Sequence, residues 1–219
     1  NFEEVGNDHN DSKNLEKAEK TLELMKVGTP FILQAVLWNP NNRTFGMPDI
    51  LARSDRINEI TVEPSIDKKS EKEKAPVLRG DYHYIVIDVK FTTLVFNASN
   101  TQLQNGHSSQ KAYKTQLAVY NKALGRLQEY EPPKAYLLGR KCSFTSRGEK
   151  NISEHSLIRL APVDFTGVDS EFYNMAEEAA DWYRWTYNEG ADWEVYPKPS
   201  IPELWPNCAN DKSYPWEKT

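Results

Sequence analysis

Two carboxylates and a lysine have the types and spacing that could do chemistry in this chain. Asp88 and Lys90 lie two residues apart in a run rich in Val, Ile, Tyr and Phe, from Tyr82 to Phe96, and Asp49 precedes them. Side chains alternate along a strand, so Asp88 and Lys90 should share one face, about 7 Å apart. A buried carboxylate and a buried ammonium are costly without partners, and a divalent metal ion and a phosphate would supply those partners.

Asp49 and Asp88 are the predicted metal ligands. Asp49 lies in the preceding predicted strand, and two neighbouring carboxylates repel each other unless a cation lies between them. Mg²⁺ prefers about six oxygens and usually takes one or two carboxylates, with water and phosphate oxygens in the rest of its shell. The two acids and the Val89 carbonyl make half of such a shell, so we expect Mg²⁺ or Mn²⁺ there. Lys90 would orient the attacking water and the scissile phosphate oxygen.

Helical spacing adds three further candidates. Gln116 and Tyr120 are four residues apart, on one face of a predicted helix, from which they could bond to a nucleic-acid backbone or to Lys90. In the first predicted helix, over residues 12–27, Glu19 falls beside the stripe of apolar positions. We therefore expect Glu19 to point toward the body of the protein.

The motifs Pro48-Asp49, Asp88-x-Lys90 and Gln116-x-x-x-Tyr120, in this order, resemble those of the PD-(D/E)XK nuclease superfamily, specifically its RecB-like branch. The resemblance covers about residues 12–139. It implies a restriction-endonuclease-like core in which Asp49 and Asp88 are metal ligands, Lys90 is the catalytic lysine, and Gln116 and Tyr120 are the branch-specific pair. An acid on the first helix often completes the site in this superfamily, and Glu19 is the candidate for it.

The composition excludes several classes of protein. Its 219 residues, 38% hydrophobic and 11% aromatic, suffice for one sizeable core, and no apolar run approaches the length of a membrane span. The net charge is -5, from 27 basic and 32 acidic residues, so any nucleic acid must be bound through local charge and metal ions. Cys142 and Cys208 are too few for an iron–sulfur cluster, which some related nucleases hold, and they indicate a reducing, intracellular compartment.

The order of predicted elements favours an α/β (α+β) fold in which helices flank a central mixed sheet. The expected elements are a helix from Asp11 or Ser12 to Val27, a strand hairpin over 31–38 and 43–54, a strand over 82–96, a helix over 110–127, strands over 135–138 and 157–161, and a helix over 169–188. The charged stretch 59–80 is expected to be an exposed, mobile excursion. We expect a single domain over 1–219, with a catalytic core over about 12–165 and a helical, Pro- and Trp-rich segment over 166–219, as part of a longer protein.

Several other side chains lie outside these motifs. The apolar face of the strand over 82–96 is predicted to pack through Ile85, Ile87, Val89 and Phe91, with His83 partly buried on that side. In the last helix, packing is favoured over base stacking for Tyr173, Trp182, Tyr183, Trp185 and Tyr187. A loop with Arg140, Lys141, Arg147 and Lys150 could hold a phosphate backbone. His107 is interpreted as incidental.

Together the motifs predict a metal-dependent nuclease that hydrolyses phosphodiester bonds, with DNA favoured over RNA. Exonuclease and endonuclease activity are both compatible with them, and an RNA endonuclease would share the same chemistry. The alternative is a catalytically inactive nuclease-fold module that binds nucleic acid or has a structural role within a larger assembly. The expected partners are nucleic acid and further domains of the same protein, and no membrane.

Overall fold

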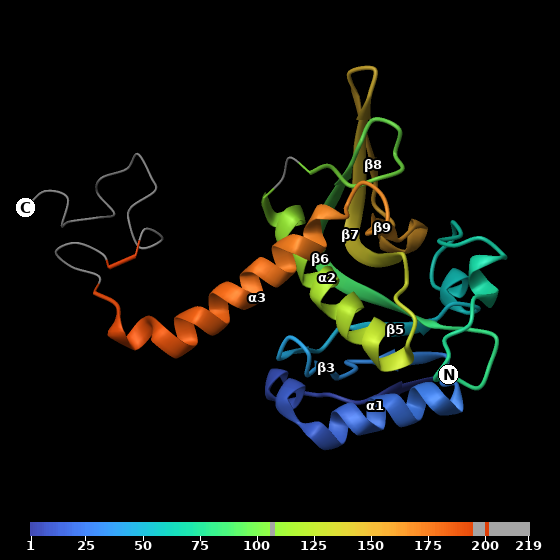
Figure 1. Cartoon of the computed structure of the whole chain (residues 1–219). Helices are drawn as coiled ribbons and strands as arrows, with labels where there is room; N and C mark the ends of the chain where they lie inside the picture. The colour runs from blue at the N-terminus through green and yellow to red at the C-terminus, as the bar shows by residue number, and fades with distance from the viewer. Residues whose placement is uncertain (106–107, 195–199, 202–219) are drawn as a thin grey trace, which may run out of the picture. The chain divides into compact units, whose positions relative to one another are not determined.

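The computed structural model describes residues 1–105, 108–194 and 200–201. The chain divides into two compact units, residues 1–177 and 178–219 (Figure 1). His107, Cys208 and most of the Pro- and Trp-rich stretch lie outside the described residues. Of the helices that are described, none has the length and apolar character needed to cross a bilayer.

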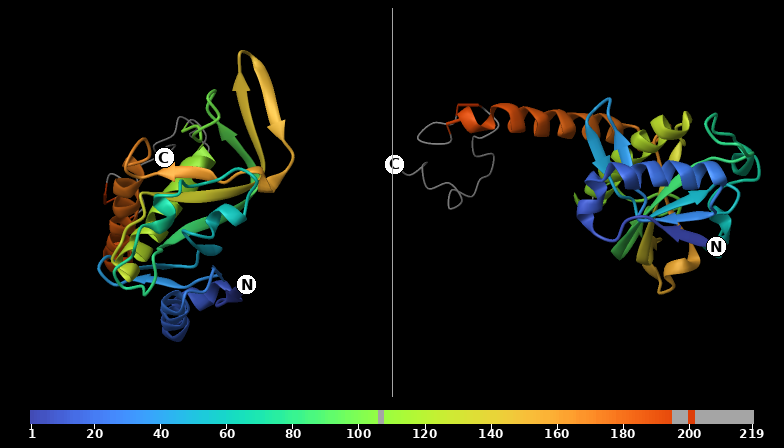
Figure 2. Two further views of the ribbon diagram at one scale, coloured as in Figure 1. Left: turned by 90° about the vertical axis from the view of Figure 1, so that its right-hand side faces the viewer. Right: turned by 90° about the horizontal axis from the view of Figure 1, so that it is seen from below.

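A mixed seven-stranded sheet organises the first unit (Figures 1 and 2), which confirms the predicted α/β class. The strands pair in the order β1-β2-β5-β6-β7-β8, and β9 pairs with β7 beside β8. The pairs β1/β2 and β6/β7 are parallel and the others are antiparallel. The strands are β1 (Phe2–Glu4), β2 (Phe31–Leu33), β5 (Ile50–Arg53), β6 (Tyr84–Phe96), β7 (Lys134–Ser146), β8 (Glu149–Ser153) and β9 (Ala161–Asp164).

Three helices bury the main core against one face of this sheet. They are α1 (Leu15–Val27), α2 (Ser108–Gln128) and the first turns of α3 (Glu171–Glu189). The core joins Val86 and Leu137 of the sheet to Met25, Leu117 and Phe172 of the helices. A smaller cluster on the opposite face contains Ala52, Ile85, Ile87, Tyr136, Ile57 and Leu160. The sheet is therefore covered on both sides, by helices on one and by irregular chain on the other.

The first helix starts later than its sequence predicts. Asn14 caps α1 by accepting a hydrogen bond from the Lys17 N–H, and Gly28 ends it in the left-handed conformation. The predicted start, Asp11, instead closes a capping box with Asp8 around a short 3₁₀ helix, η1 (His9–Lys13). Its carboxylate accepts backbone N–H groups there, so it is not available to cap α1.

The predicted hairpin over 31–38 and 43–54 forms, but each of its arms breaks into two strands. At Gln34 the backbone turns left-handed, with φ 49°, and the chain leaves the main sheet after β2. It then forms β3 (Leu37–Asn39), which pairs with β4 (Thr44–Gly46) in a separate two-stranded sheet, and returns as β5. The Gln34 N–H bonds to the Asp49 carbonyl across this break. The interruption thus places Asp49 beside Gln34.

The prediction of an exposed excursion over 59–80 is wrong for several of its residues. Ala75 and Leu78 are buried in the main core. Glu71 is buried as well, because its carboxylate accepts hydrogen bonds from Asn58 and Lys68. Hydrogen-bonded charges in this stretch therefore allow part of it to pack.

The predicted basic loop between two short strands is instead a β-hairpin. β7 continues to Ser146, and Arg147 and Gly148 turn the chain into β8, both with positive φ, as two-residue hairpin turns require. Arg140 and Lys141 lie within β7, and Lys150 lies within β8. The other predicted strand, 157–161, becomes the 3₁₀ helix η4 (Ser156–Ile158) followed by β9.

The aromatic stripe of α3 does not pack uniformly. In the first unit, Tyr173 stacks on Phe165 with ring centroids 4.5 Å apart, as predicted. In the second unit, Trp182 and Trp185 form a ring cluster with Trp193. Tyr183 and Tyr187 are exposed, which contradicts a packing role for them, because the side chains at their positions on the helix have no described neighbour to cover them.

Candidate active site

Asp49 is held between the end of β2 and the middle of β6. Its Oδ1 accepts a hydrogen bond from Gln34 Nε2 at 3.0 Å, and its Oδ2 accepts one from the Val89 N–H at 2.6 Å. The second bond places the Asp49 carboxylate against the peptide that joins Asp88 to Val89. Each oxygen has a further lone pair that can bind another group.

Asp88 is buried on the helix-covered side of β6, with 3% of its surface exposed. Its Oδ2 lies 2.5 Å from Lys90 Nζ as an ion pair. Apart from this ion pair, the buried oxygen has no hydrogen-bond partner among the described residues. Burial raises the pKa of Asp88 to about 6; Lys90 opposes this shift and Asp49 adds to it. When both acids are ionised, the site therefore has two negative charges and only one positive charge.

Lys90 connects the acids to α2. Its Nζ donates to Gln116 Oε1 at 2.7 Å and lies 5.1 Å from the centroid of the Tyr113 ring. Gln116 Nε2 in turn donates to the Tyr120 hydroxyl at 2.8 Å. A continuous polar chain thus runs from Asp88 through Lys90 and Gln116 to Tyr120, as the spacing of these residues suggested.

Tyr120 is the last residue of this hydrogen-bonded series and packs against the β3–β4 hairpin. Its ring lies on Gly46, where an added Cβ would come within 2.3 Å of the ring. Only glycine therefore allows this approach. Burial raises the pKa of Tyr120 to about 12, with a further contribution from the charge of Asp88. The phenol consequently stays neutral at physiological pH and acts as a hydrogen-bonding group.

An irregularity in β6 follows Lys90 directly. Lys90 pairs with Gly139 and Thr93 pairs with Lys141, so β6 has one extra residue in this interval. Such bulges interrupt a ladder and redirect neighbouring side chains. Ile85 and Ile87 pack as predicted, but Val89 is 45% exposed and Phe91 87% exposed. Their predicted packing is wrong because the apolar cluster on that face ends at Ile87.

Glu19 is not brought to the pair of acids. It is exposed on α1, while the buried polar residue of that helix is Thr21, whose hydroxyl accepts the Val36 N–H at 3.0 Å. Within the described parts of the chain, no group of three or more His, Cys, Asp or Glu side chains is placed to hold a metal ion. Asp49 and Asp88 remain as two carboxylates.

The donors nonetheless suit a hard divalent cation. The unpartnered Asp88 oxygen and the remaining lone pairs of Asp49 are carboxylate ligands of the kind that Mg²⁺ and Mn²⁺ take in pairs. The Val89 N–H bonds to Asp49, and the Val89 carbonyl remains the predicted third ligand. Gln34 is the site residue that the motifs missed; its only signal was a polar interruption in the apolar run from Phe31 to Trp38.

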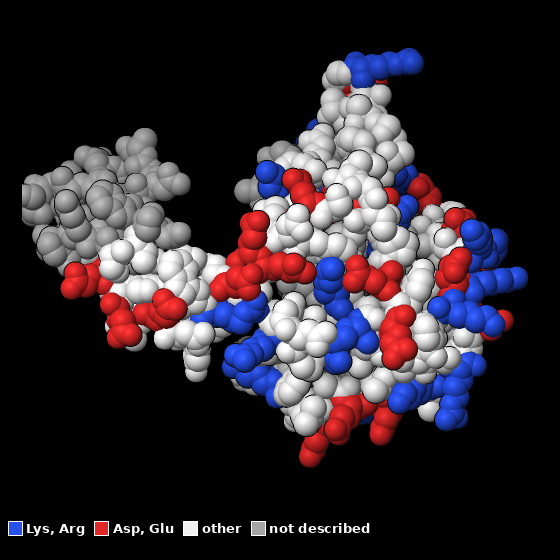
Figure 3. All heavy atoms as spheres, viewed as in Figure 1, with Lys and Arg blue, Asp and Glu red and all other residues white. Residues whose placement is uncertain are grey.

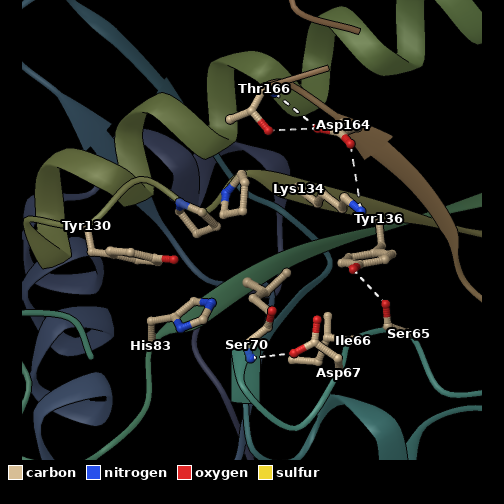
Figure 4. A pocket seen from close by; sticks show the side chains of 13 residues that line it. Ser65, Ile66, Asp67, Ser70, His83, Tyr130, Lys134, Tyr136, Asp164 and Thr166 are labelled. Carbon is tan, nitrogen blue, oxygen red and sulfur yellow. Dashed lines mark hydrogen bonds and ion pairs between the residues drawn. The ribbon is translucent and has the colours of Figure 1, made fainter. Parts of the chain in front are cut away.

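A cavity of about 370 Å³ on the opposite face of the sheet is a less suitable reaction site (Figure 4). His83 lines it and is more buried than predicted; its Nδ1 lies 2.9 Å from the Glu73 carbonyl, and burial lowers its pKa. The cavity acids already have partners: Asp67 accepts two backbone N–H groups, and Asp164 bonds to Thr166. Unlike Asp88, neither acid has a buried oxygen that lacks a hydrogen bond.

Comparison of the sequence with protein-family models and with curated proteins gives no match. The functional interpretation therefore rests on the side chains and their geometry.

Proposed function

We propose that this chain is a metal-dependent nuclease that hydrolyses phosphodiester bonds, with DNA favoured over RNA. The observation that carries the proposal is the convergence of Asp49, Asp88 and Lys90, with one buried carboxylate oxygen of Asp88 left without a hydrogen-bond partner. Lys90 supplies one positive charge to two neighbouring carboxylates, so a divalent cation would balance the negative charge that remains.

Asp49, Asp88 and the Val89 carbonyl would hold the cation. The chemistry that Mg²⁺ or Mn²⁺ supplies when bound there is polarisation of a phosphate oxygen and a lowered pKa of water. The chain itself contributes a fixed orientation, because Gln34 and the Val89 N–H hold the Asp49 carboxylate from two sides. Preorganised ligands need no rearrangement when the substrate arrives.

Lys90 is the residue that would contact the reacting phosphate or the attacking water. Gln116 accepts one of its three ammonium N–H bonds, so beside its ion pair with Asp88 Lys90 has N–H bonds left for an oxygen of the substrate or the water. A fixed positive charge at this position stabilises the negative charge that develops on the phosphate. Gln116 and Tyr120 act as positioning residues, since they reach the site through Lys90.

The local charge is consistent with a site that relies on a cation. On the face shown in Figure 3, acidic and basic side chains are interspersed, with basic side chains at the tip of the β7–β8 hairpin. No globally basic surface is expected at a net charge of -5. Binding of nucleic acid must then be concentrated where particular cations meet the strand.

A second candidate is the inactive nuclease-fold module. The exposed position of Glu19 favours it, because only two of the three acids suggested by the family resemblance come together. Such a module would bind nucleic acid or a larger assembly without turnover.

A cleavage assay separates the two. Wild type, Asp49→Asn and the control Lys111→Met, which changes an exposed residue of α2, are incubated with labelled single-stranded DNA and the matched RNA in Mn²⁺ or in EDTA. We expect metal-dependent cleavage by wild type and the control, DNA before RNA, and loss of cleavage in Asp49→Asn. Cleavage that survives Asp49→Asn, or none by wild type, would overturn the nuclease proposal; metal-independent binding without cleavage would support the module.

A further inference from the structure

The β3–β4 hairpin has two faces, and one of them adjoins the candidate active site. Leu37 pairs with Gly46, and Trp38 pairs with Phe45. Leu37 is buried in the core and Gly46 lies under the Tyr120 ring. Because successive side chains alternate, Trp38 and Phe45 lie together on the other face.

This second face lines a cavity of about 420 Å³. Its walls are the aromatic pair Trp38 and Phe45, with Pro40, and its charged lining residues are Lys13 and Arg43, both basic. Among the described residues, neither cation has an acidic partner, although the protein as a whole is acidic. An apolar slot whose lining includes two cations without an acidic partner is complementary to a flat, anionic ligand.

The slot is fixed before any ligand arrives. The Trp38 indole N–H donates to the Ser12 carbonyl at 2.7 Å, and the Trp38 carbonyl accepts a hydrogen bond from Arg126 at 3.2 Å. Arg43 occupies the left-handed region, with φ 54°, where glycine or asparagine is usual. Arg43 thus places a cation at a backbone position that disfavours arginine.

We propose that this cavity is a subsite for an unpaired nucleobase of the substrate strand, which makes single-stranded nucleic acid the substrate class. The proposal rests on the nuclease function above. Aromatic side chains stack on bases of any sequence, and flanking cations contact the phosphates. A duplex hides the faces of its bases, so only an unpaired base can enter.

The position of the subsite along the chain suits a strand that also reaches the acids. Phe45 precedes Asp49 by four residues, a span of at most about 14 Å. About four stacked base steps are long enough to cover that distance. One strand can therefore occupy the aromatic slot and present a phosphate a few nucleotides away to Asp49 and Lys90.

The test measures binding and catalysis separately. Anisotropy of labelled oligothymidylate and of a duplex of equal length is recorded in Ca²⁺ for wild type, Phe45→Ala and Arg43→Gly. The control is Phe2→Ala, which removes another exposed aromatic ring, on the edge strand β1. We expect about tenfold weaker binding of the single strand for Phe45→Ala, a smaller loss for Arg43→Gly, no loss for Phe2→Ala and no change with the duplex.

Hydrolysis of bis(p-nitrophenyl) phosphate in Mn²⁺ gives the second readout, because this substrate has no neighbouring nucleotides to enter the subsite. Equal rates for wild type and both subsite variants, with the binding losses above, support the subsite. Unchanged single-strand binding in both variants, equal losses with the duplex, or an equal fall in hydrolysis of the small substrate would overturn it. Cleavage by wild type of neither the small substrate nor the labelled oligonucleotide, with binding that still depends on Phe45, would overturn the nuclease function and leave a strand-binding site.

Discussion

Two buried lysine–aspartate pairs meet α2 in this protein, and they differ in how completely their hydrogen bonds are satisfied. Lys114 lies 2.5 Å from Asp169, and Lys90 lies 2.5 Å from Asp88. Three of these side chains are at most 4% exposed, and Lys90 is 18% exposed. Equal separation and similar burial make the pairs alike in Coulombic terms.

The Lys114–Asp169 pair is saturated, in the sense that its hydrogen-bonding groups have partners within the protein. Lys114 Nζ also donates to Asn105 Oδ1 at 2.5 Å and to the Leu103 carbonyl at 3.4 Å, which uses all three N–H bonds. The other oxygen of Asp169 accepts the Asp164 N–H at 2.9 Å. This pair ties α2 to the segment before α3 and has no capacity left for a ligand.

The Lys90–Asp88 pair is unsaturated. Asp88 has an oxygen without a hydrogen bond, a second acid beside it and a raised pKa. Buried polar groups normally find hydrogen-bond partners, and we propose that a bound cation balances the second carboxylate at this pair. The same pair of residue types is structural where its hydrogen bonds are satisfied, and we propose that it is chemically competent where they are not.

Lys114→Met should produce the largest effect, on stability. It leaves Asp169 buried without its cation, which costs about 3–5 kcal/mol of unfolding free energy. Urea denaturation measures the loss, with the exposed Lys111→Met as control. A loss below about 1 kcal/mol would show that the saturated pair does not stabilise the fold.

Lys90→Met should act on catalysis instead. The expected fall in kcat is about 10³-fold, comparable to about 4 kcal/mol, because a preorganised charge at the reacting phosphate is removed. The unfolding free energy should fall much less than in Lys114→Met, since Asp88 can take up a proton. Kinetics and urea denaturation on the same preparations check both statements. Wild-type kcat in Lys90→Met, or a stability loss equal to that of Lys114→Met, would remove the distinction.

Asp88→Asn should stabilise the metal-free protein at pH 8. The folded pKa of Asp88, about 6, is above its ordinary value of 3.8, so the folded state binds the extra proton and wild-type stability falls as the pH rises from about 4 to 6. The variant avoids this loss of unfolding free energy, which amounts to about 3 kcal/mol at most. Denaturation in EDTA across this pH range measures the difference, which should disappear near pH 4. A variant less stable than wild type at pH 8 would contradict an unfavourable ionisation of Asp88 in the folded protein.

Gln116→Met should have the smallest effect. Lys90 loses one acceptor but keeps Asp88, so we expect kcat to fall about tenfold, with KM unchanged, as for the loss of one hydrogen bond to a charged group. Tyr120→Phe, which removes only the hydroxyl that Gln116 contacts, should lose less. Steady-state kinetics of both variants decide this, and a larger effect from Tyr120→Phe would assign the phenol a direct role.

Sequence patterns predicted the elements with strong periodicity and the placement of several candidate site residues within them. The alternation in β6 places Asp88 and Lys90 on one face, and the helical spacing in α2 does the same for Gln116 and Tyr120, because these relations are local. The contact between Lys90 and Gln116 depends on the fold. The sequence could not show that Val89 and Phe91 face outward, since their exposure depends on where distant chain stops covering the sheet.

Prediction from the sequence also failed for polar and charged residues whose partners are distant along the chain. Lys114 looks like an ordinary polar position of α2, and only the fold brings Asp169 and Asn105 to it. Glu19 was placed from the helical stripe of α1, but the stripe fixes only its angle around the helix and not its distance from Asp49. Gln34 reaches the site through a left-handed backbone break that has no signature in apolar periodicity.

The central claim, that Asp49 and Asp88 form a divalent cation site, is tested most directly by counting bound Mn²⁺. Electron paramagnetic resonance of free Mn²⁺ is titrated with wild type, Asp88→Asn and the control Asp67→Asn, an acid of the other cavity. We expect saturable binding by wild type and the control, and at least about tenfold weaker binding by Asp88→Asn. Binding that is absent in wild type, or equal in wild type and Asp88→Asn, would contradict the claim.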